Sequence, residues 1–284
     1  MTLTDDQRAF AASLHDLLAG AGTPSIARAW AQGVPEPGLA LWRRLGKLGV
    51  TALAVPAAHG GLEADRLDVV AAFEELGHHA VPGPLIETIV VAPLIAPQEW
   101  LERIAVGEAL AAVAPSFLDA DVADLVLGGE PGPLVVGVDR TRRLHPIAGE
   151  PELPDLAVLA CAAQLLGLGQ ALLETSVAYA KQRVQFGQAI GRYQAIKHKM
   201  ADVFIALEFA RPLLYHAGTP RDVSAAKVAC GDAAYLAART ALQVHGAIGY
   251  TEEHDLGIYL TKVRALLGAW GTATHHRDRI MASL

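Results

Sequence analysis

Six residues in two glycine-containing segments have the groups that a bound dinucleotide requires. They are Arg183, Phe186, Gly187, Gln194, Gln243 and Gly246. A pyrophosphate binds a guanidinium fork or backbone N–H groups, and an adenine binds aromatic surfaces and amide groups. Arg183 and Phe186 could serve these two parts, while the glycines allow the backbone to come close. An arginine at a helix end can equally be the partner of the helix dipole, so both interpretations stay open.

A second group of side chains has the chemistry of metal ligands. Glu75-Leu-Gly-His78 is a Glu-x-x-His pair at helical spacing, the form used in di-iron bundles, and His275-His276 adds two imidazoles. A di-iron site needs two such pairs and two further glutamates on facing helices. The sequence has one clear copy, so we expect no metal site.

The composition limits the class of protein and its partners. The chain has 284 residues, of which 52% are hydrophobic and 19% are charged. Such a chain can offset the entropy of ordering, so disorder is excluded as its main state, and its length allows one or two domains. Lys and Arg number 23 and Asp and Glu number 30, which gives a net charge of −7. We therefore expect no binding to nucleic acid.

The most apolar run lies between Leu156 and Leu173 and is interrupted by Gln164 and Gln170. These amides predict a buried core helix and not a membrane span. The first ten residues lack the basic and apolar regions of a signal peptide, and the two cysteines stand in alanine-rich runs typical of buried, reduced thiols. The sequence therefore predicts a cytoplasmic protein.

Helical patterns dominate the chain on both sides of a short β-rich segment. Thr4-Asp5-Asp6-Gln7 has the form of a capping box and predicts a helix start. Two shorter helices are expected at the end of the chain, and the other helical patterns cover about 24–31, 37–48, 66–79, 85–95, 154–183, 193–217 and 221–245. Short valine- and leucine-rich runs predict strands at about 110–115, 124–127 and 133–138. We divide the chain into an N-terminal helical domain (1–108), a reduced middle β segment (109–150) and a C-terminal helical bundle (151–284).

The motifs in both helical regions resemble those of the acyl-CoA dehydrogenase family. The two segments with the dinucleotide-binding residues look like its Arg-x-x-Phe-Gly and Gln-x-x-Gly loops, and residues 48–56, 60–62 and 74–77 are similar to its N-terminal domain. The resemblance implies a mainly α fold with an N-terminal helical domain and a C-terminal four-helix bundle. It also implies that FAD is the cofactor, and that the six residues contact an FAD held mainly by a neighbouring subunit.

Both positions at which the family places its catalytic base lack a carboxylate in this chain. The reaction needs a carboxylate that removes the α-proton while a hydride passes to the flavin. Where most relatives have Glu-Gly-Thr this chain has Trp270-Gly-Thr, and the second position, counted back from the Phe-Gly loop, is Ala157. Asp155 is a weak candidate for a displaced base, with Glu152 as another. An acid before a helix is more often a cap, which is the interpretation we favour.

The middle segment is shorter than the resemblance implies. Relatives have a full β domain with a Thr-Glu-Pro stretch that covers the flavin, and no such stretch stands here between Glu108 and the C-terminal bundle. Most of the flavin-covering domain is therefore absent from this chain.

Together these departures predict a companion subunit. The chain resembles the short subunit of heteromeric (α2β2) actinobacterial acyl-CoA dehydrogenases, in which a full-length partner supplies the base and the covering domain. The resemblance implies an acyl-CoA substrate, with bulky CoA thioesters from steroid degradation among the candidates. The alternative is a non-catalytic helical interaction module that has lost flavin. Ala247, where most relatives have a second glycine, slightly favours this alternative.

Overall fold

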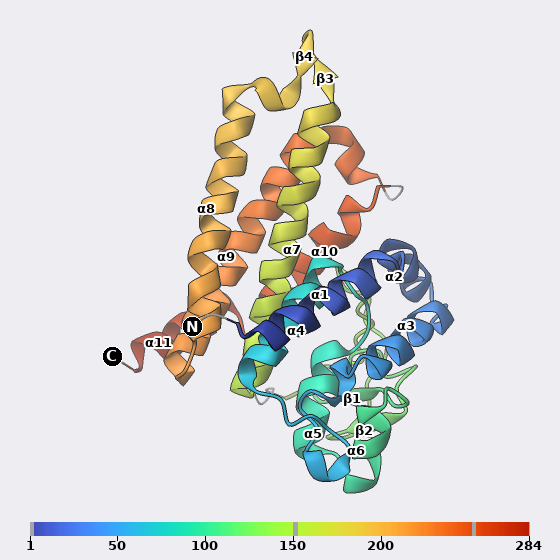
Figure 1. Cartoon of the computed structure of the whole chain (residues 1–284). Coiled ribbons are helices and arrows are strands. Elements are labelled where there is room, and N and C mark those ends of the chain that lie inside the picture. Colours follow the sequence, from blue (N-terminus) through green and yellow to red (C-terminus); the bar gives the residue numbers. More distant parts are fainter. Residues whose placement is uncertain (1–2, 150–152, 252–253, 284) are drawn as a thin grey trace.

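An upright bundle of long helices forms one side of the molecule, and shorter helices of the N-terminal half pack against its lower part (Figure 1). This computed structural model describes residues 3–149, 153–251 and 254–283. The predicted mainly helical fold is confirmed, since strands are few and short throughout the described residues.

The N-terminal half is helical from its first turn. The predicted capping box at Thr4 is present, because its hydroxyl accepts from the backbone of Gln7 and the Gln7 amide oxygen accepts from the backbone of Thr4. The helices are α1 (Asp5–Ala19), α2 (Thr23–Ala31), α3 (Glu36–Lys47), α4 (Arg66–His78), α5 (Ala92–Ile95) and α6 (Gln98–Ala105). Short 3-10 turns stand at Val50–Ala52 and Ala57–His59. The sequence did not predict α6, and the expected helix over 85–95 contains a π-helical turn at Glu87–Val91.

The middle segment contains less β structure than predicted. β1 (Ala111–Val113) pairs in parallel with β2 (Leu125–Leu127). The third predicted strand, over 133–138, is wrong: Val135 makes one isolated bridge to Leu144 and the run lies exposed at the surface. A run of valines needs a neighbouring strand before its backbone can form a ladder, and none of the described segments provides one.

The C-terminal half is built on α7 (Asp155–Gln182), which is the most buried long helix. It is apolar enough by composition to cross a membrane, but 89% of its most apolar window is buried inside the protein, so the predicted core helix is confirmed. The elements after it are β3 (Val184–Gln185), β4 (Gln188–Ala189), α8 (Gln194–His216), α9 (Pro220–His245), α10 (Leu256–Gly268) and α11 (Ala273–Met281). 3-10 turns precede α8 at Ile190–Arg192 and follow α9 at Gly246–Tyr250.

Helices α4 and α7 cross at backbone contact. A Cβ atom built on Gly77 would overlap the carbonyl oxygen of Gln164, and one built on Gly167 would overlap the carbonyl oxygen of Glu74. Glycines at both positions therefore let the two helices come closer than side chains allow. Glu74 also accepts hydrogen bonds from Arg211 and Tyr215 of α8, so the same crossing connects the N-terminal half to two helices of the bundle.

The crossing predicts that Gly167→Ala destabilises the chain. The added methyl group meets backbone atoms that cannot rotate away, so we expect a loss of about 3 kcal/mol or more in the free energy of unfolding, measured by urea denaturation. Gly257→Ala in α10 is the control, because no described heavy atom lies within 4 Å of its added Cβ and alanine gains helix propensity of up to about 1 kcal/mol. Equal stability of the two variants would contradict the close crossing.

Candidate functional site

The first segment predicted to bind a dinucleotide lies at the exposed tip of the bundle. Arg183 caps the end of α7, and the β3–β4 hairpin that follows places Phe186 at φ 51° and Gly187 at φ 80°. Phe186 is 92% exposed, so its ring is open to contact from outside the chain. The Tyr193 hydroxyl, 3.3 Å from the carbonyl oxygens of Gln185 and Phe186, holds the hairpin in place.

The second segment lies at the same end of the bundle because α7, α8 and α9 alternate in direction (Figure 1). Gln194 begins α8 at this end, and Gln243 lies in the last turn of α9. His245 stacks on Tyr179 of α7 with ring centroids 4.4 Å apart, which fixes the two helix ends side by side. The structure therefore brings all six sequence-predicted residues to one end of the bundle.

The side chains at this tip are available to a ligand. Arg183 has no ion-pair partner among the described residues, and the side chains of Gln194 and Gln243 are exposed. A Cβ atom at Gly187 or Gly246 would meet no described atom within 4 Å, so the backbone is open at both glycines. A cation, two amides, an exposed ring and open backbone fit the pyrophosphate and adenine of FAD, approached from outside the chain.

His245 is a residue of this tip that sequence reasoning missed. Its Nδ1 lies 2.8 Å from the carbonyl oxygen of Ala241, whereas its buried Nε2 has no hydrogen-bond partner among the described residues. Burial lowers the pKa of His245, so the ring is neutral at pH 7. A histidine in the last turn of a helix is typical of a dipole partner, and the sequence held no stronger signal for it.

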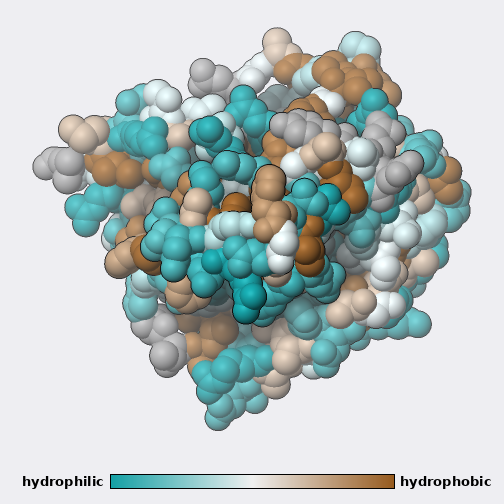
Figure 2. All heavy atoms as spheres, turned by 90° about the horizontal axis from the view of Figure 1, so that it is seen from above, coloured by the Kyte–Doolittle hydropathy of each residue, from teal (hydrophilic) through white to brown (hydrophobic). Residues whose placement is uncertain are grey.

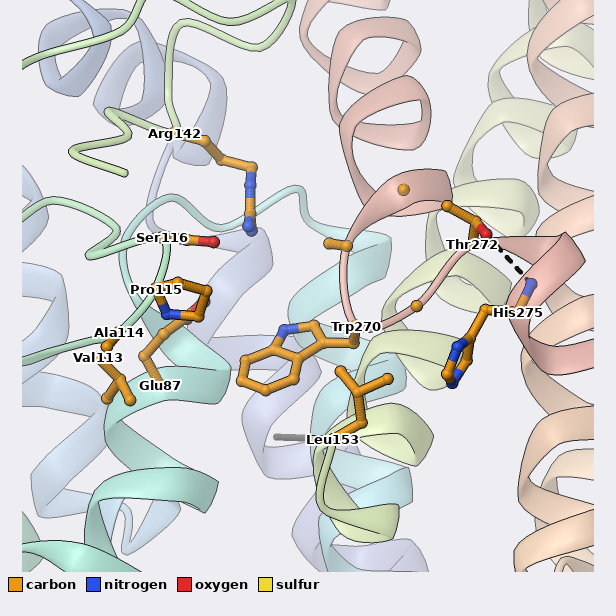
Figure 3. A pocket seen from close by; sticks show the side chains of 13 residues that line it. Glu87, Val113, Ala114, Pro115, Ser116, Arg142, Leu153, Trp270, Thr272 and His275 are labelled. Atoms are coloured by element: carbon orange, nitrogen blue, oxygen red, sulfur yellow. Dashed lines mark hydrogen bonds between the residues drawn. The ribbon is translucent and has the colours of Figure 1, made fainter. Parts of the chain in front are cut away.

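The residue predicted at the first base position lies at the other end of α7. Trp270 adopts the left-handed φ of 57° in the turn between α10 and α11, and its indole projects into a cavity of ≈ 380 Å³ (Figure 3). Its carbonyl oxygen lies 2.9 Å from Nε2 of His276, and Thr272 caps α11. The position at which the sequence resemblance implies a carboxylate therefore presents an indole to this cavity.

The other positions considered for the catalytic base are Ala157, Asp155 and Glu152. Ala157 is buried in the first turn of α7 and carries no acid. Asp155 begins that helix and accepts from the guanidinium of Arg279 at 2.6 Å, which makes it a partner of α11. Glu152 lies outside the described residues.

Glu87 is a buried carboxyl group in the same cavity that the sequence did not single out. It opens the π-helical turn and is 4% exposed, and in Figure 3 it lies near the indole of Trp270 with Arg142 reaching toward the space from above. Burial raises the pKa of Glu87, and the charge of Arg142 only partly opposes that effect. The sequence could not identify Glu87, because no spacing of residues distinguishes an acid that lines a cavity from any other acid in an apolar helix.

A buried ion pair fixes the middle segment to the bundle beside this cavity. Lys262 of α10 lies 3.5 Å from the carboxylate of Asp139 and donates to Thr141 at 3.0 Å, and Thr141 in turn donates to Asp139. Burial alone would raise the pKa of Asp139, but Lys262 and the hydrogen bonds from Thr141 outweigh it and hold the pKa below its usual value. This network positions the segment that carries Arg142.

The tip and the cavity are separated by the length of α7. They stand at opposite ends of this helix, whose 28 residues span about 42 Å at the helical rise. The residues predicted to bind a dinucleotide are therefore remote from Trp270 and Glu87 within this chain.

Comparison with known families finds two matching models. The model described as acyl-CoA dehydrogenase, N-terminal domain, matches residues 4–108, and the one described as acyl-CoA dehydrogenase, C-terminal domain, matches residues 157–284.

Curated relatives include the acyl-CoA dehydrogenase IpdE2 of Mycobacterium tuberculosis, which is 32% identical over 92% of both chains. The acyl-CoA dehydrogenase FadE34 of the same organism is 29% identical over 99% of this chain and 48% of its own. Among solved structures, the Tcur3481–Tcur3483 steroid ACAD G363A variant superimposes with a TM-score of 0.83 at 21% identity, over 99% of this chain and 98% of that one. A chain of the ChsE4–ChsE5 complex from Mycobacterium tuberculosis superimposes with a TM-score of 0.82 at 20% identity, over 99% of this chain and 98% of that one.

The buried ion pair yields a prediction about stability and its pH dependence. Lys262→Met leaves Asp139 buried without its cation, so we expect the free energy of unfolding at pH 7 to fall by about 3–5 kcal/mol in urea denaturation. In the wild type the lowered pKa of Asp139 contributes stability that is fully present above the unfolded value of 3.8 and is lost as the pH falls from there through the lower pKa of the folded state. In the variant burial raises that pKa, so acidification no longer removes this contribution.

The double variant Lys262→Met/Asp139→Asn is the matched control, since it removes both charges and should recover most of the lost stability. A single variant as stable as the wild type would contradict the assigned role of the pair.

Proposed function

The chain belongs to the acyl-CoA dehydrogenase family, whose cofactor is FAD, and from this membership we propose that it is the subunit without a catalytic base in a heteromeric acyl-CoA dehydrogenase. One observation supports the proposal most: the residues predicted to bind a dinucleotide lie exposed at one end of α7, and Trp270, at the predicted base position, lies at the other end. In this proposal the chain contributes cofactor contacts to a neighbouring subunit but no catalytic base of its own.

The residues of the tip would hold the FAD of the partner. Arg183 would pair with the pyrophosphate, Phe186 would cover the adenine, and the amides of Gln194 and Gln243 would donate to the polar edge of the dinucleotide. When bound, FAD accepts a hydride from the acyl thioester. The α-proton must leave to a carboxylate at the same time, and this group would come from the partner subunit.

Exposed apolar side chains on the bundle support a large partner. Phe209 of α8 is 73% exposed, and neighbouring exposed apolar residues of the same helix are Phe204, Ile205 and Leu213. Figure 2, which looks onto the tip of the bundle, shows hydrophobic side chains exposed between hydrophilic ones. Surfaces of this kind are typical of subunit interfaces. A full-length acyl-CoA dehydrogenase-like subunit in an α2β2 heterotetramer would cover them.

The proposed substrate is a CoA thioester with a bulky, sterol-derived acyl group, and the proposed location is the cytoplasm. The solved relative named a steroid ACAD and the heteromeric ChsE4–ChsE5 complex support this class of enzyme. In the alternative proposal, the chain is a helical interaction module without flavin, which the methyl group of Ala247 beside the open Gly246 favours.

The cofactor contact predicts that Arg183→Gln weakens FAD binding by the co-purified complex. Loss of a charge-assisted hydrogen bond contributes about 1.5–3 kcal/mol, so we expect roughly 10- to 100-fold weaker binding, measured from the flavin absorbance per complex during dilution or dialysis. Arg221→Gln removes an exposed arginine at the opposite end of the bundle and should leave flavin content unchanged. Unchanged flavin content in both variants would favour the interaction module.

If the partner subunit supplies the catalytic base, Asp155→Asn should leave the turnover of the complex unchanged. Asp155 already pairs with Arg279, and its loss should lower stability slightly without affecting the chemical step. We expect kcat for the acyl-CoA substrate to stay close to that of the wild type. A general base contributes about 100-fold or more, so a fall of that size with folding intact would identify Asp155 as the displaced base.

A further inference from the structure

Four potential metal ligands meet where α1 packs against the end of α4. They are His15, Glu75, His78 and His79, which together we name the histidine cluster. One ligand atom of each residue lies within 4.8 Å of the corresponding atoms of the other three. The sequence predicted no metal, because the Glu75–His78 pair had no second copy. The structure adds His15 from α1, sixty residues earlier, and His79 at the end of α4.

Two distances inside the histidine cluster are close to those of a tetrahedral metal site. Nδ1 of His15 lies 2.9 Å from Oε2 of Glu75 and 3.3 Å from Nε2 of His79. At the bond lengths of zinc to nitrogen and oxygen, two ligand atoms of a tetrahedral site stand about 3.3–3.4 Å apart. The 3.3 Å between the two imidazole nitrogens matches this value, and the carboxylate oxygen at 2.9 Å would move slightly outward when an ion binds.

His78 has the environment of a metal-bound histidine. Its Nε2 lies 3.0 Å from Oε2 of Glu174 on α7, while its Nδ1 is buried and has no hydrogen-bond partner among the described residues. A histidine that donates one N–H to a carboxylate keeps its other nitrogen as a lone pair, and metal-binding histidines usually have this arrangement. Gln170 donates to the other oxygen of Glu174 at 2.8 Å and fixes the carboxylate.

We propose that this end of α1 and α4 forms a structural Zn²⁺ site with four protein ligands, His15, Glu75, His78 and His79. Three imidazoles and one carboxylate are a ligand set that zinc prefers, and a site closed by four protein ligands is structural. The ion would fasten α1 to α4. It can enter from solvent, since the His15 side chain is 44% exposed.

The site is tested on the full chain, co-purified with its partner if it needs one, after treatment with EDTA. Titration with Zn²⁺ against a chromophoric chelator should show one equivalent bound per chain. In the variant His15→Gln/His79→Gln we expect the affinity to fall by more than about 100-fold, a larger loss than the 10- to 100-fold expected for Glu174→Gln, which removes only the supporting carboxylate. His198→Gln, on the exposed face of α8, is the control and should bind as the wild type does.

A second measurement separates binding from folding. Zn²⁺ should raise the thermal midpoint of the wild type and of His198→Gln, but not that of the double variant, and Mg²⁺ should raise none of them. With Co²⁺ in place of Zn²⁺, the wild type should show the intense visible absorption of a tetrahedral complex. Equal Zn²⁺ affinity in the wild type and the folded double variant would overturn the proposal, as would a wild type that binds no Zn²⁺.

Discussion

The approach of α4 to α7 at Gly77 and Gly167 is the contact on which the rest of the structure depends. With these glycines the backbones touch, so the N-terminal half packs directly on the most buried helix of the bundle. Because the two helices are so close, Glu74 can accept hydrogen bonds from Arg211 and Tyr215, and His78 lies within hydrogen-bonding distance of Glu174. One crossing thus aligns the N-terminal helices, the bundle and the histidine cluster, and a wider separation would break all of these contacts together.

The length of α7 determines how the functional parts are separated. Its C-terminal end carries Arg183 and the exposed hairpin, and its N-terminal end lies beside the cavity with Trp270 and Glu87. A helix of this length keeps the two regions apart, so residues at the tip do not reach the cavity of their own chain. The proposed role at a neighbour's cofactor site follows from this separation more than from any single residue.

The sequence predicted features that depend on local chemistry. The capping box at Thr4, the core helix α7 and the loop that carries Phe186 follow from residue types a few positions apart, and the structure has each of these elements. The sequence did not predict features that depend on contacts with residues far away along the chain. His15 joins the histidine cluster only because α1 packs on α4, and Glu87 reaches the cavity through a π-helical turn. The run over 133–138 has strand-forming residues but no strand beside it, which local pattern cannot reveal.

The turn around Trp270 is held by close contacts with His276. A side chain on Gly271 would collide with the ring of His276, whose two nitrogens lie within hydrogen-bonding distance of the Ser224 hydroxyl and the Trp270 carbonyl oxygen. This arrangement positions a residue toward the cavity with a left-handed backbone, a costly conformation for a non-glycine residue. The indole lines the same cavity as the buried carboxyl group of Glu87, whose pKa is raised by burial. A carboxylate at position 270 would place a second acid beside Glu87 with little water to solvate it, which costs free energy, whereas an indole carries no charge into this space.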